Sequence, residues 1–272
     1  MDGDRQLTST ANPRVKFVVG LRSRRSRDAQ GVTCLDGIAE TRLALDAGWT
    51  VRTLFHCAEL MGADAAAGAE LVARARSAGA ETIAVSRTVF ERMAYREGPD
   101  GILAVVPSPG AALASLDVPA GALVVVAQRI EKPGNLGAML RTADAAGVAA
   151  VIAADPVTDW GNPNVIRASK GTVFSVPVAA ADTGSTLAWL AERGLTLVAT
   201  TPDTSVRHFD ADLTGGIAVA VGAEKWGLDE RMLAAAGLRV RIPMAGRADS
   251  LNAATSAAIV LYEAVRQRSL SG

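Results

Sequence analysis

Residues 123–154, LVVVAQRIEKPGNLGAMLRTADAAGVAAVIAA, carry the clearest structural signal in this chain of 272 residues. An apolar run over Leu123–Ala127 is followed by a helical pattern over Leu136–Ala146 and by a second apolar run over Val151–Ala154. Short apolar runs on either side of a helix are typical of parallel strands that are buried on both faces. We therefore predict a βαβ unit at this point.

The same alternation continues to the C-terminus. Apolar runs predict further strands at Leu195–Thr200, Ile217–Val221 and Leu238–Ile242. Helical patterns predict helices at Thr183–Arg193 and Asp229–Ala236. Strands and helices in alternation predict a doubly wound α/β domain with a parallel sheet.

A smaller α/β domain is expected before this one. Its predicted helices cover residues 36–48 and 66–78, and its predicted strands cover residues 50–55, 82–85 and 102–106. The run PSPGAALASLDVPAG, residues 107–121, is rich in Pro, Gly, Ser and Ala and is typical of a linker. The chain therefore divides into a first domain, a linker and a second domain, at residues 1–107, 108–121 and 122–272.

Composition points to a globular protein. Hydrophobic residues make up 49% of the chain and aromatic residues 4%, so we expect a core built mainly of Ala, Val, Leu and Ile. No apolar run approaches the ~18–20 residues of a membrane span, and no signal peptide is recognisable. The two cysteines, Cys34 and Cys57, are expected to be buried thiols, and no Cys/His cluster has the spacing of metal ligands. We expect a cytoplasmic protein without a metal.

The formal net charge is zero, but basic residues gather near the N-terminus. No acidic residue interrupts residues 12–27, so this stretch could neutralise the phosphates of a nucleic acid. The alternative is a solvated basic segment without a ligand. The basic residues of the stretch are Arg14, Lys16, Arg22, Arg24, Arg25 and Arg27.

Four polar, glycine-rich loops follow predicted strands of the second domain, where parallel sheets bind their ligands. They contain EKPGNLGAMLRTADAAG, ATTPD, VGAEKWGLDE and IPMAGRADSLNAATS. Neither GxGxxG nor the phosphate loop GxxxxGK[ST] occurs in the chain. These absences argue against a nicotinamide dehydrogenase and a P-loop nucleotidase.

Two of these loops supply candidate site residues. In the first, Asn135 and Arg141 could serve one site near a helix N-terminus, or they could be a helix cap and an exposed arginine. In the last, we predict Ser250 as the cap of the C-terminal helix, beside amides near Leu251 and Asn252 that could hold a polar ligand. Apolar walls would come from Pro243, Met244 and Leu251. The polar residues left for the site are Asn135, Arg141, Glu224, Ser250 and Asn252, with Lys132 and Lys225 at its edges.

Three ordered motifs resemble the SpoU/TrmH family of SPOUT methyltransferases. They are PGNLGAMLRTADAAG from Pro133, AVAVGAEKWGL from Ala218 and IPMAGRADSLNAATSAAIVLYEA from Ile242. A fourth segment, VIRASKGTVFSVPV from Val165, fits between the first two. The resemblance implies a parallel sheet with a deep trefoil knot. The first domain resembles the family's small RNA-binding domain of ribosomal-protein L30 type.

The family's chemistry supplies further expectations. The resemblance implies a homodimer that uses S-adenosylmethionine to methylate a ribose 2′-hydroxyl of RNA, with Arg141 of one subunit meeting the cofactor of the other. It places catalytic roles on Arg141, Asn135, Glu224, Ser250 and Asn252. It places cofactor contacts on Thr200, Thr201, Gly222, Ile242, Met244, Leu251 and Asn252. The expected RNA contacts are Arg141 and the basic residues at positions 14–27.

Several alternatives stay open at this point. A guanidinium is normally always protonated, so Arg141 could act as a base only if its surroundings lower its pKa; otherwise it orients the ribose and stabilises charge on its oxygen. Many relatives have Asp-Pro where this chain has Lys132-Pro133, and Trp226 is bulkier than expected, so it could stack on a base or make a core or dimer contact. Ribosomal RNA is the expected substrate, either for antibiotic resistance, as in the avilamycin-resistance branch, or for housekeeping methylation. Transfer RNA, a small molecule and a noncatalytic RNA-binding role are the alternatives.

Overall fold

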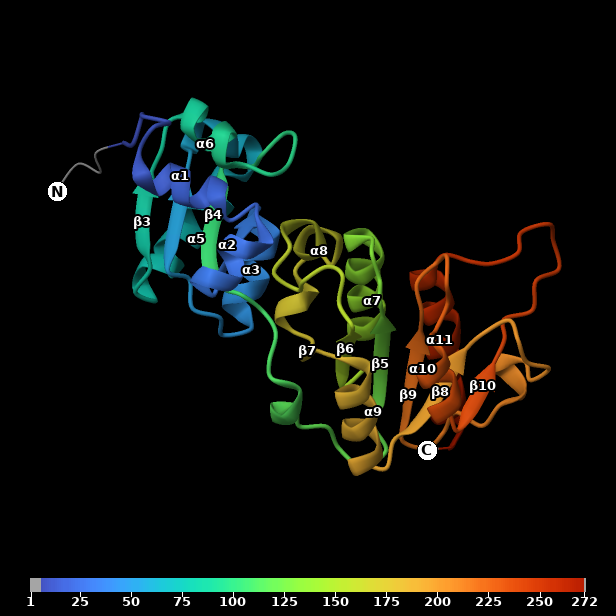
Figure 1. The fold of residues 1–272 in the computed structure, drawn as a ribbon. Helices are drawn as coiled ribbons and strands as arrows, with labels where there is room; N and C mark the ends of the chain where they lie inside the picture. Colours follow the sequence, from blue (N-terminus) through green and yellow to red (C-terminus); the bar gives the residue numbers. More distant parts are fainter. Residues whose placement is uncertain (1–5, 272) are drawn as a thin grey trace. The chain divides into compact units, whose positions relative to one another are not determined.

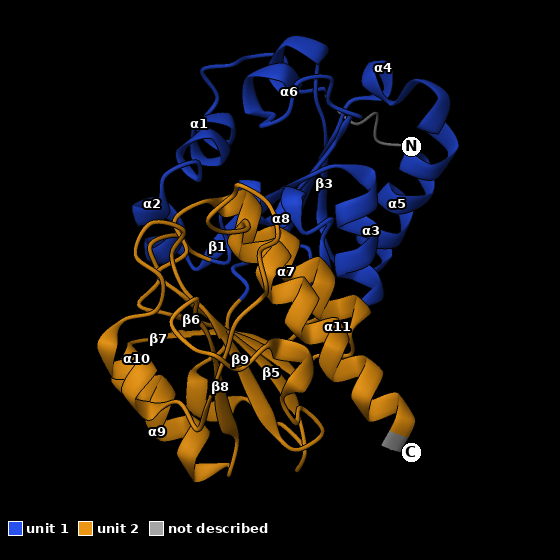
Figure 2. Ribbon diagram, turned by 90° about the vertical axis from the view of Figure 1, so that its right-hand side faces the viewer, with its two compact units in different colours: residues 1–109, 160–175 blue, residues 110–159, 176–272 orange. Residues whose placement is uncertain are grey.

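The computed structural model describes residues 6–271, which form two compact units (Figures 1 and 2). Unit 1 contains the chain up to Pro109 together with Trp160–Ser175. Unit 2 contains Gly110–Asp159 and the chain from Val176 onward. The segment 160–175, which the sequence placed in the second domain, thus belongs to unit 1.

Unit 1 is built on a four-stranded sheet with the strand order β1-β4-β2-β3. Strand β4 pairs antiparallel with β1 and β2, while β2 and β3 are parallel. The strands are β1 (Val32–Asp36), β2 (Thr53–His56), β3 (Glu81–Ala84) and β4 (Ile102–Pro107). The helices are α1 (Pro13–Gly20), α2 (Arg24–Gln30), α3 (Ile38–Asp46), α4 (Ala58–Met61), α5 (Ala65–Ser77), α6 (Arg87–Met93) and α8 (Pro163–Ala168), with short 3₁₀ turns η1 (Gly62–Asp64) and η3 (Thr172–Phe174).

Segment 160–175 is held within unit 1 by specific contacts. Helix α8 packs on β1, where the buried Thr33 hydroxyl donates to the carbonyl of Gly161. The Trp49 indole donates to the carbonyl of Phe174 at 2.9 Å, and the two rings meet edge to face at 5.0 Å between their centroids. Buried polar groups and an aromatic pair therefore join this segment to the first-domain sequence.

Unit 2 is built on a six-stranded sheet with the order β10-β8-β9-β5-β6-β7, and every pair is parallel. The strands are β5 (Leu123–Gln128), β6 (Ala150–Ala154), β7 (Val178–Ala181), β8 (Thr196–Thr200), β9 (Ile217–Val221) and β10 (Leu238–Val240). The helices are α7 (Pro133–Ala145), α9 (Thr183–Glu192), α10 (Glu230–Ala235) and α11 (Ala253–Ser271), with 3₁₀ turns η2 (Leu113–Ser115) and η4 (His208–Asp210). The predicted parallel α/β sheet is confirmed.

Helices cover both faces of this sheet, which is why its strands are apolar throughout. Helices α7 and α11 pack together on one face, and α9 and α10 pack together on the other (Figure 2). Val124, Val125 and Val126 of the central strand β5 have no exposed surface. Adjacent residues of a strand point to opposite faces, so both faces are buried.

Residues 110–121 are packed within unit 2. The Ala111 amide donates to the carbonyl of Val178 at 2.8 Å. Leu116 is only 4% exposed and lies in the apolar core beside Ala122 and Val124. Most of the segment predicted as a linker is therefore anchored to the sheet that follows it.

Candidate active site

The two central strands of unit 2 create a crevice. Strands β5 and β9 are neighbours, but the chain leaves β5 toward α7 on one face and leaves β9 toward α10 on the other. At such a switch point the loops after the strands diverge and leave room for a ligand. The carboxyl ends of β5 and β9 are therefore where the site should lie.

Three of the predicted catalytic residues meet at this point. The Asn135 side-chain amide donates to Glu224 Oε1 at 2.9 Å, and the Asn252 amide donates to Glu224 Oε1 at 2.9 Å and to Asn135 Oδ1 at 2.8 Å. Lys132 forms an ion pair with the second carboxylate oxygen of Glu224. The loops after β5 and β9 and the start of α11 thus converge on one carboxylate.

Asn135 is not the cap of helix α7. Helix α7 starts with Pro133, its N-cap position is Lys132, and no side chain caps it. Asn135 lies in the first turn, is 9% exposed, and directs its amide to Glu224. The structure therefore excludes the cap and leaves Asn135 as a candidate site residue.

The predicted helix cap at Ser250 is wrong, because Asn252 caps the C-terminal helix. Helix α11 begins at Ala253, and Asn252 Oδ1 accepts from the Ala254 amide at 2.9 Å and from the Thr255 amide at 3.4 Å. Ser250 is exposed and lies two residues before the cap. Asn252 therefore fixes the helix start with its oxygen and the Glu224 cluster with its nitrogen.

The Glu224 cluster lowers the pKa of this carboxyl below its ordinary value of 4.5. The first cause is the hydrogen bond from Lys132, followed by that from Asn135; the charge of Lys132 and the amide of Asn252 act in the same direction. All of these donors favour the ionised form. Glu224 therefore stays charged at neutral and mildly acidic pH.

This lowered pKa predicts how stability depends on pH. Because the folded-state pKa is depressed, the contribution of the carboxylate is complete above about pH 4.5 and is lost as the pH falls through the lowered pKa. Melting temperatures of the wild type and Glu224→Gln should differ by a constant amount between about pH 7 and 5, and the difference should shrink as the pH falls below about 4.5. A difference that does not change with pH down to the acid unfolding of the protein would show that the charge of Glu224 is not what the cluster uses.

Gly222 allows the loop after β9 to fold closely on itself. A Cβ at this position would lie 2.0 Å from the carbonyl carbon of Gly227 and 2.3 Å from the amide nitrogen of Leu228. The turn is closed by the Gly227 amide, which donates to the carbonyl of Ala223 at 2.8 Å. Only glycine fits at Gly222, because the obstructing atoms are backbone.

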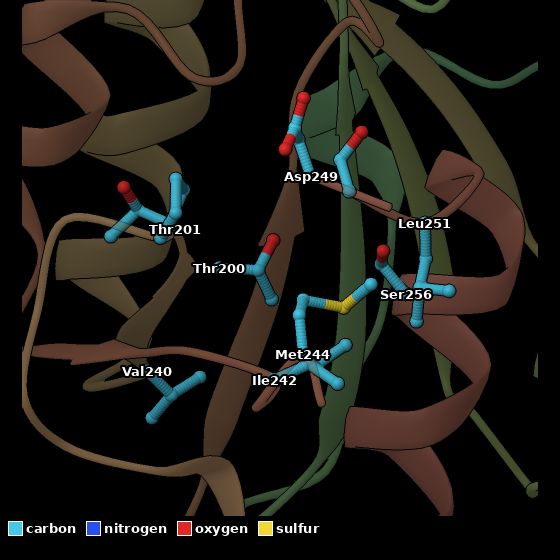
Figure 3. Close-up of a pocket in the computed structure, with 10 residues that line it drawn as sticks. Thr200, Thr201, Val240, Ile242, Met244, Asp249, Leu251 and Ser256 are labelled. Carbon is cyan, nitrogen blue, oxygen red and sulfur yellow. The ribbon is translucent and has the colours of Figure 1, made fainter. Parts of the chain in front are cut away.

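A cavity of about 390 Å³ lies beside the cluster and adjoins a smaller one of about 120 Å³. Thr200, Leu251 and Ser256 line both, and Figure 3 shows these side chains with Ile242 and Met244 around the smaller one. The larger volume lies within the ~300–1,000 Å³ typical of ligand pockets. The predicted cofactor residues that line one or both cavities are Thr200, Thr201, Gly222, Ile242, Met244 and Leu251, and Ser250 also lines both.

Two residues predicted for this cavity do not line it. Asn252, predicted to contact the cofactor, lines neither cavity, because its side chain is turned to Asn135 and Glu224. Pro243, predicted as an apolar wall, is also absent from both linings; Val240 and Ile242 supply that surface.

Arg141 is not brought to the cluster within this chain. It lies on the exposed side of α7 and lines none of the cavities described above. Its guanidinium makes no hydrogen bond or ion pair with any other residue between positions 6 and 271. Its guanidinium is therefore available to another molecule.

Two arginines of the basic stretch serve the fold of unit 1. Arg27, predicted to contact RNA, is 2% exposed and donates to the carbonyls of Leu21 and Arg22 at 2.9 and 3.0 Å. Arg22 donates to the carbonyl of Ala94 at 2.8 Å and lies over the Tyr95 ring. The RNA assignment of Arg27 is wrong, because a buried guanidinium that binds carbonyls cannot reach a phosphate.

The other basic residues of the stretch are exposed. Arg14 pairs with Glu81 at 2.5 Å, and Arg24 approaches Asp28 at 3.5 Å. Lys16 and Arg25 are exposed without an ion pair to any residue between positions 6 and 271. They are the strongest remaining candidates for phosphate contacts.

Sequence reasoning missed Gln128, which positions the loop that carries Glu224. Gln128 is completely buried at the end of β5; its amide donates to Thr183 Oγ1 at 2.7 Å and its oxygen accepts from the Asp229 amide at 2.9 Å. Asp229 in turn caps α10. The sequence contains one signal for this role, because a polar residue ends the apolar run LVVVAQ. A side-chain amide that is buried at the end of a strand needs hydrogen-bond partners.

Two features are absent from the part of the chain that the structure describes. No helix there has the length and apolarity that crossing a bilayer requires. No group of three or more His, Cys, Asp or Glu side chains there has the arrangement of a metal site.

Known proteins match this chain along most of its length. Residues 122–262 match the SpoU rRNA Methylase family, and residues 12–104 match an MRM3-like substrate binding domain. A 23S rRNA (uridine(2479)-2′-O)-methyltransferase of Streptomyces viridochromogenes is 33% identical over 270 residues, which cover 97% of this chain and 93% of that one.

Two solved structures with bound S-adenosylmethionine have the same fold. The SpoU methyltransferase AviRb from Streptomyces viridochromogenes is 33% identical with a TM-score of 0.85, and the match covers 96% of this chain and 100% of that one. An rRNA methyltransferase from Sinorhizobium meliloti is 31% identical with a TM-score of 0.88, over 96% of this chain and 97% of that one. By its motifs, its parallel sheet and these matches, the chain belongs to the SpoU rRNA methylase family.

Proposed function

We propose that this protein is an S-adenosylmethionine-dependent methyltransferase that methylates a ribose 2′-hydroxyl of 23S ribosomal RNA. The observation that carries the proposal is the Asn135–Glu224–Asn252 cluster, which three separate loops bring together at the switch point of the sheet. A similarity to a 23S rRNA 2′-O-methyltransferase that extends over 97% of the chain adds support.

The cavity residues suit the proposed cofactor. Ile242, Met244 and Leu251 offer apolar surface for a purine, while Thr200 and Ser256 add polar atoms. The space that a Cβ at Gly222 would fill is taken by the folded-back loop, so this wall is backbone. When bound there, S-adenosylmethionine supplies a methyl group on a positively charged sulfonium.

The chain's own residues then position the acceptor. Asn135, Glu224 and Asn252 hold the loops around the cavity in one arrangement, so that little reorganisation is needed when RNA binds. Arg141 acts on the ribose hydroxyl, either by accepting its proton or by stabilising negative charge on its oxygen. The second role requires no change in the charge of the guanidinium.

The proposal includes a homodimer in which Arg141 serves the cavity of the other subunit. What supports it is that Arg141 is exposed on α7 and lines neither of the two cavities beside the Glu224 cluster in its own chain. Helix α11 packs beside α7 and exposes 49% of Tyr262. A second copy on this helical face would cover apolar surface and complete the site.

We also propose the deep trefoil knot, the L30-type first domain and a cytoplasmic location. Loops at residues 200–202, 222–228 and 250–256 line one cavity, as expected where a knotted chain folds back through itself. The substrate-binding match at residues 12–104 supports RNA binding by unit 1.

Lys16 and Arg25 should contribute to RNA binding. Replacing both by glutamine is expected to weaken RNA affinity and to reduce the slope of log affinity against log salt by about 1.5, since each phosphate contact contributes about 0.7–0.9. Filter binding across a salt series measures this. Arg231→Gln, an exposed arginine on α10, is the control. An unchanged slope in the double variant would place the RNA contacts elsewhere.

The experiment that tests the function is transfer of labelled methyl from S-adenosylmethionine to ribosomal RNA and to transfer RNA, followed by nucleoside analysis. A 2′-O-methylated nucleoside from 23S ribosomal RNA is the expected product. Labelling of transfer RNA alone would overturn the proposal that ribosomal RNA is the substrate. Cofactor binding without transfer to any RNA or ribosomal particle would favour a noncatalytic or small-molecule role.

The proposal extends to antibiotic resistance. Expression of the protein in a sensitive host, followed by growth on avilamycin, would test this role.

A further inference from the structure

Trp226 is unusual among the tryptophans of this chain because its side chain is in solvent. It is 74% exposed, whereas Trp160 and Trp189 are 3% and 4% exposed and Trp49 is half-buried. An indole has a large apolar surface, and leaving it in water forgoes the free energy of burial. The exposure excludes a core role and leaves the ring open to contact with another molecule.

The loop that carries Trp226 is held in a fixed shape. Gly222 lies against the peptide of Gly227, and the Gly227 amide returns to the carbonyl of Ala223. Glu224, two residues before Trp226, is bound by Lys132, Asn135 and Asn252. The indole therefore projects from a short closed turn, and ordering it on binding costs less entropy than ordering an open loop.

Position and charge favour one kind of occupant. Trp226 and Lys225 line the cavity of about 390 Å³ beside the Glu224 cluster. The ammonium of Lys225 lies 4.5 Å from the centroid of the indole, on one face of the ring. A cation beside a flat aromatic surface is the combination that binds single-stranded nucleic acid, because the ring stacks on a base and the cation attracts a phosphate.

A contact between two copies of the chain fits less well. The Trp226 loop leads into α10, which lies on the sheet face opposite to α7 and α11. The proposed dimer uses the α7 and α11 face, where Arg141 is exposed. The ring therefore lies away from the proposed α7 and α11 contact itself, in the cavity that the partner's Arg141 is proposed to serve and that the RNA must enter.

We propose that Trp226 stacks on an unpaired nucleobase of the RNA substrate next to the ribose that is methylated, and that Lys225 contacts the adjoining phosphate. This inference rests on the proposed function. RNA-binding proteins commonly read unstacked bases by laying them on aromatic rings. Trp226 thereby selects a nucleotide in a loop or bulge over one within a helix.

The test compares Trp226→Ala and Trp226→Phe with the wild type in methylation of ribosomal RNA. Loss of stacking should raise the KM for RNA about 10-fold, which corresponds to about 1.4 kcal/mol, and leave kcat within about twofold. The phenylalanine variant keeps a ring and should stay within about threefold of the wild type. Phe209→Ala is a matched control, because Phe209 is 44% exposed, has the Arg207 guanidinium over its ring and lines neither cavity.

Fluorescence gives a readout that is independent of turnover. Trp226 is the most exposed of the four tryptophans, so acrylamide should quench mainly its emission. Adding ribosomal RNA to the wild type should protect this emission from acrylamide. Trp226→Phe should lack the quenchable emission altogether. Isothermal titration measures whether the variants still bind S-adenosylmethionine, and the molar mass in solution measures whether they still form the dimer.

Each outcome decides the inference. An unchanged KM for RNA with no shielding overturns it, as does a KM effect of equal size in Phe209→Ala. A rise in the cofactor dissociation constant would assign Trp226 to the cofactor, and a monomeric Trp226→Ala would assign it to the dimer. If the wild type methylates no RNA, the proposed function fails, and shielding by RNA alone then decides the role of Trp226.

Discussion

Replacing Arg141 by alanine should slow methyl transfer about 10³-fold and leave the dissociation constant of S-adenosylmethionine unchanged. The rate falls because the ribose hydroxyl loses either its base or the positive charge that stabilises its oxygen. Cofactor affinity is preserved because the proposed contact of Arg141 is with the ribose hydroxyl of the RNA and not with the cofactor. Single-turnover methylation of ribosomal RNA and isothermal titration measure the two quantities.

Two control variants separate this effect from a general loss of positive charge. Arg231→Ala removes an exposed arginine from α10, on the other face of the sheet, and should keep the wild-type rate. Arg141→Lys keeps the charge but loses the planar fork of donors, so only partial activity is expected. A wild-type rate in Arg141→Ala would remove the catalytic assignment.

The origin of Arg141 can be tested by mixing inactive subunits. If one subunit supplies Arg141 and the other the Glu224 cluster, a heterodimer of Arg141→Ala and Glu224→Ala contains one intact site. Random exchange should then restore about a quarter of the wild-type activity. No recovery after verified exchange would mean that each site is built from a single chain.

Gly222→Ala should cause the second largest effect, a loss of about 100-fold in cofactor affinity. Its Cβ would fall 2.0 Å from the carbonyl carbon of Gly227, so the turn must open. Opening displaces Glu224, and overpacking of this kind costs about 1–3 kcal/mol of stability. Isothermal titration gives the affinity, and urea unfolding gives the free energy of unfolding.

The matched control for this variant is Gly215→Ala. A Cβ at Gly215 would meet no atom within 4 Å, and its φ does not require glycine. This variant should therefore bind the cofactor normally. Equal behaviour of the two variants would mean that the close approach at Gly222 is not needed for cofactor binding.

The sequence predicts the sheet of unit 2 well, because its central strands are continuous apolar runs. Strand β9 has the predicted bounds, and β5 differs only by Gln128 at its end. Strand β7, Val178–Ala181, was missed because the run VAAA resembles the alanine-rich helices of this chain. The convergence of Asn135 and Glu224 follows from the rule that ligands bind at the carboxyl ends of parallel strands.

Other errors have a common cause, since they depend on tertiary contacts. Ser and Asn are both good helix caps, so the sequence alone does not decide between Ser250 and Asn252. Asn252 is held in place by its hydrogen bond to Glu224, which lies 28 residues away in the chain. Arg27 looks like a surface arginine until the carbonyls of Leu21 and Arg22 enclose it. No periodicity in the chain reveals that residues 160–175 complete the first unit.

That placement of residues 160–175 limits how this enzyme can be taken apart. The chain passes from one unit to the other at residues 109/110, 159/160 and 175/176, so the units are joined by three covalent connections. A fragment cut in the segment 108–121 would carry α8 without β1, and Val165 and Ile166, now buried, would face water. Grafting a new substrate domain onto this catalytic domain therefore requires exchanging residues 160–175 along with it, and so the protein is not modular in the way that its linear sequence suggests.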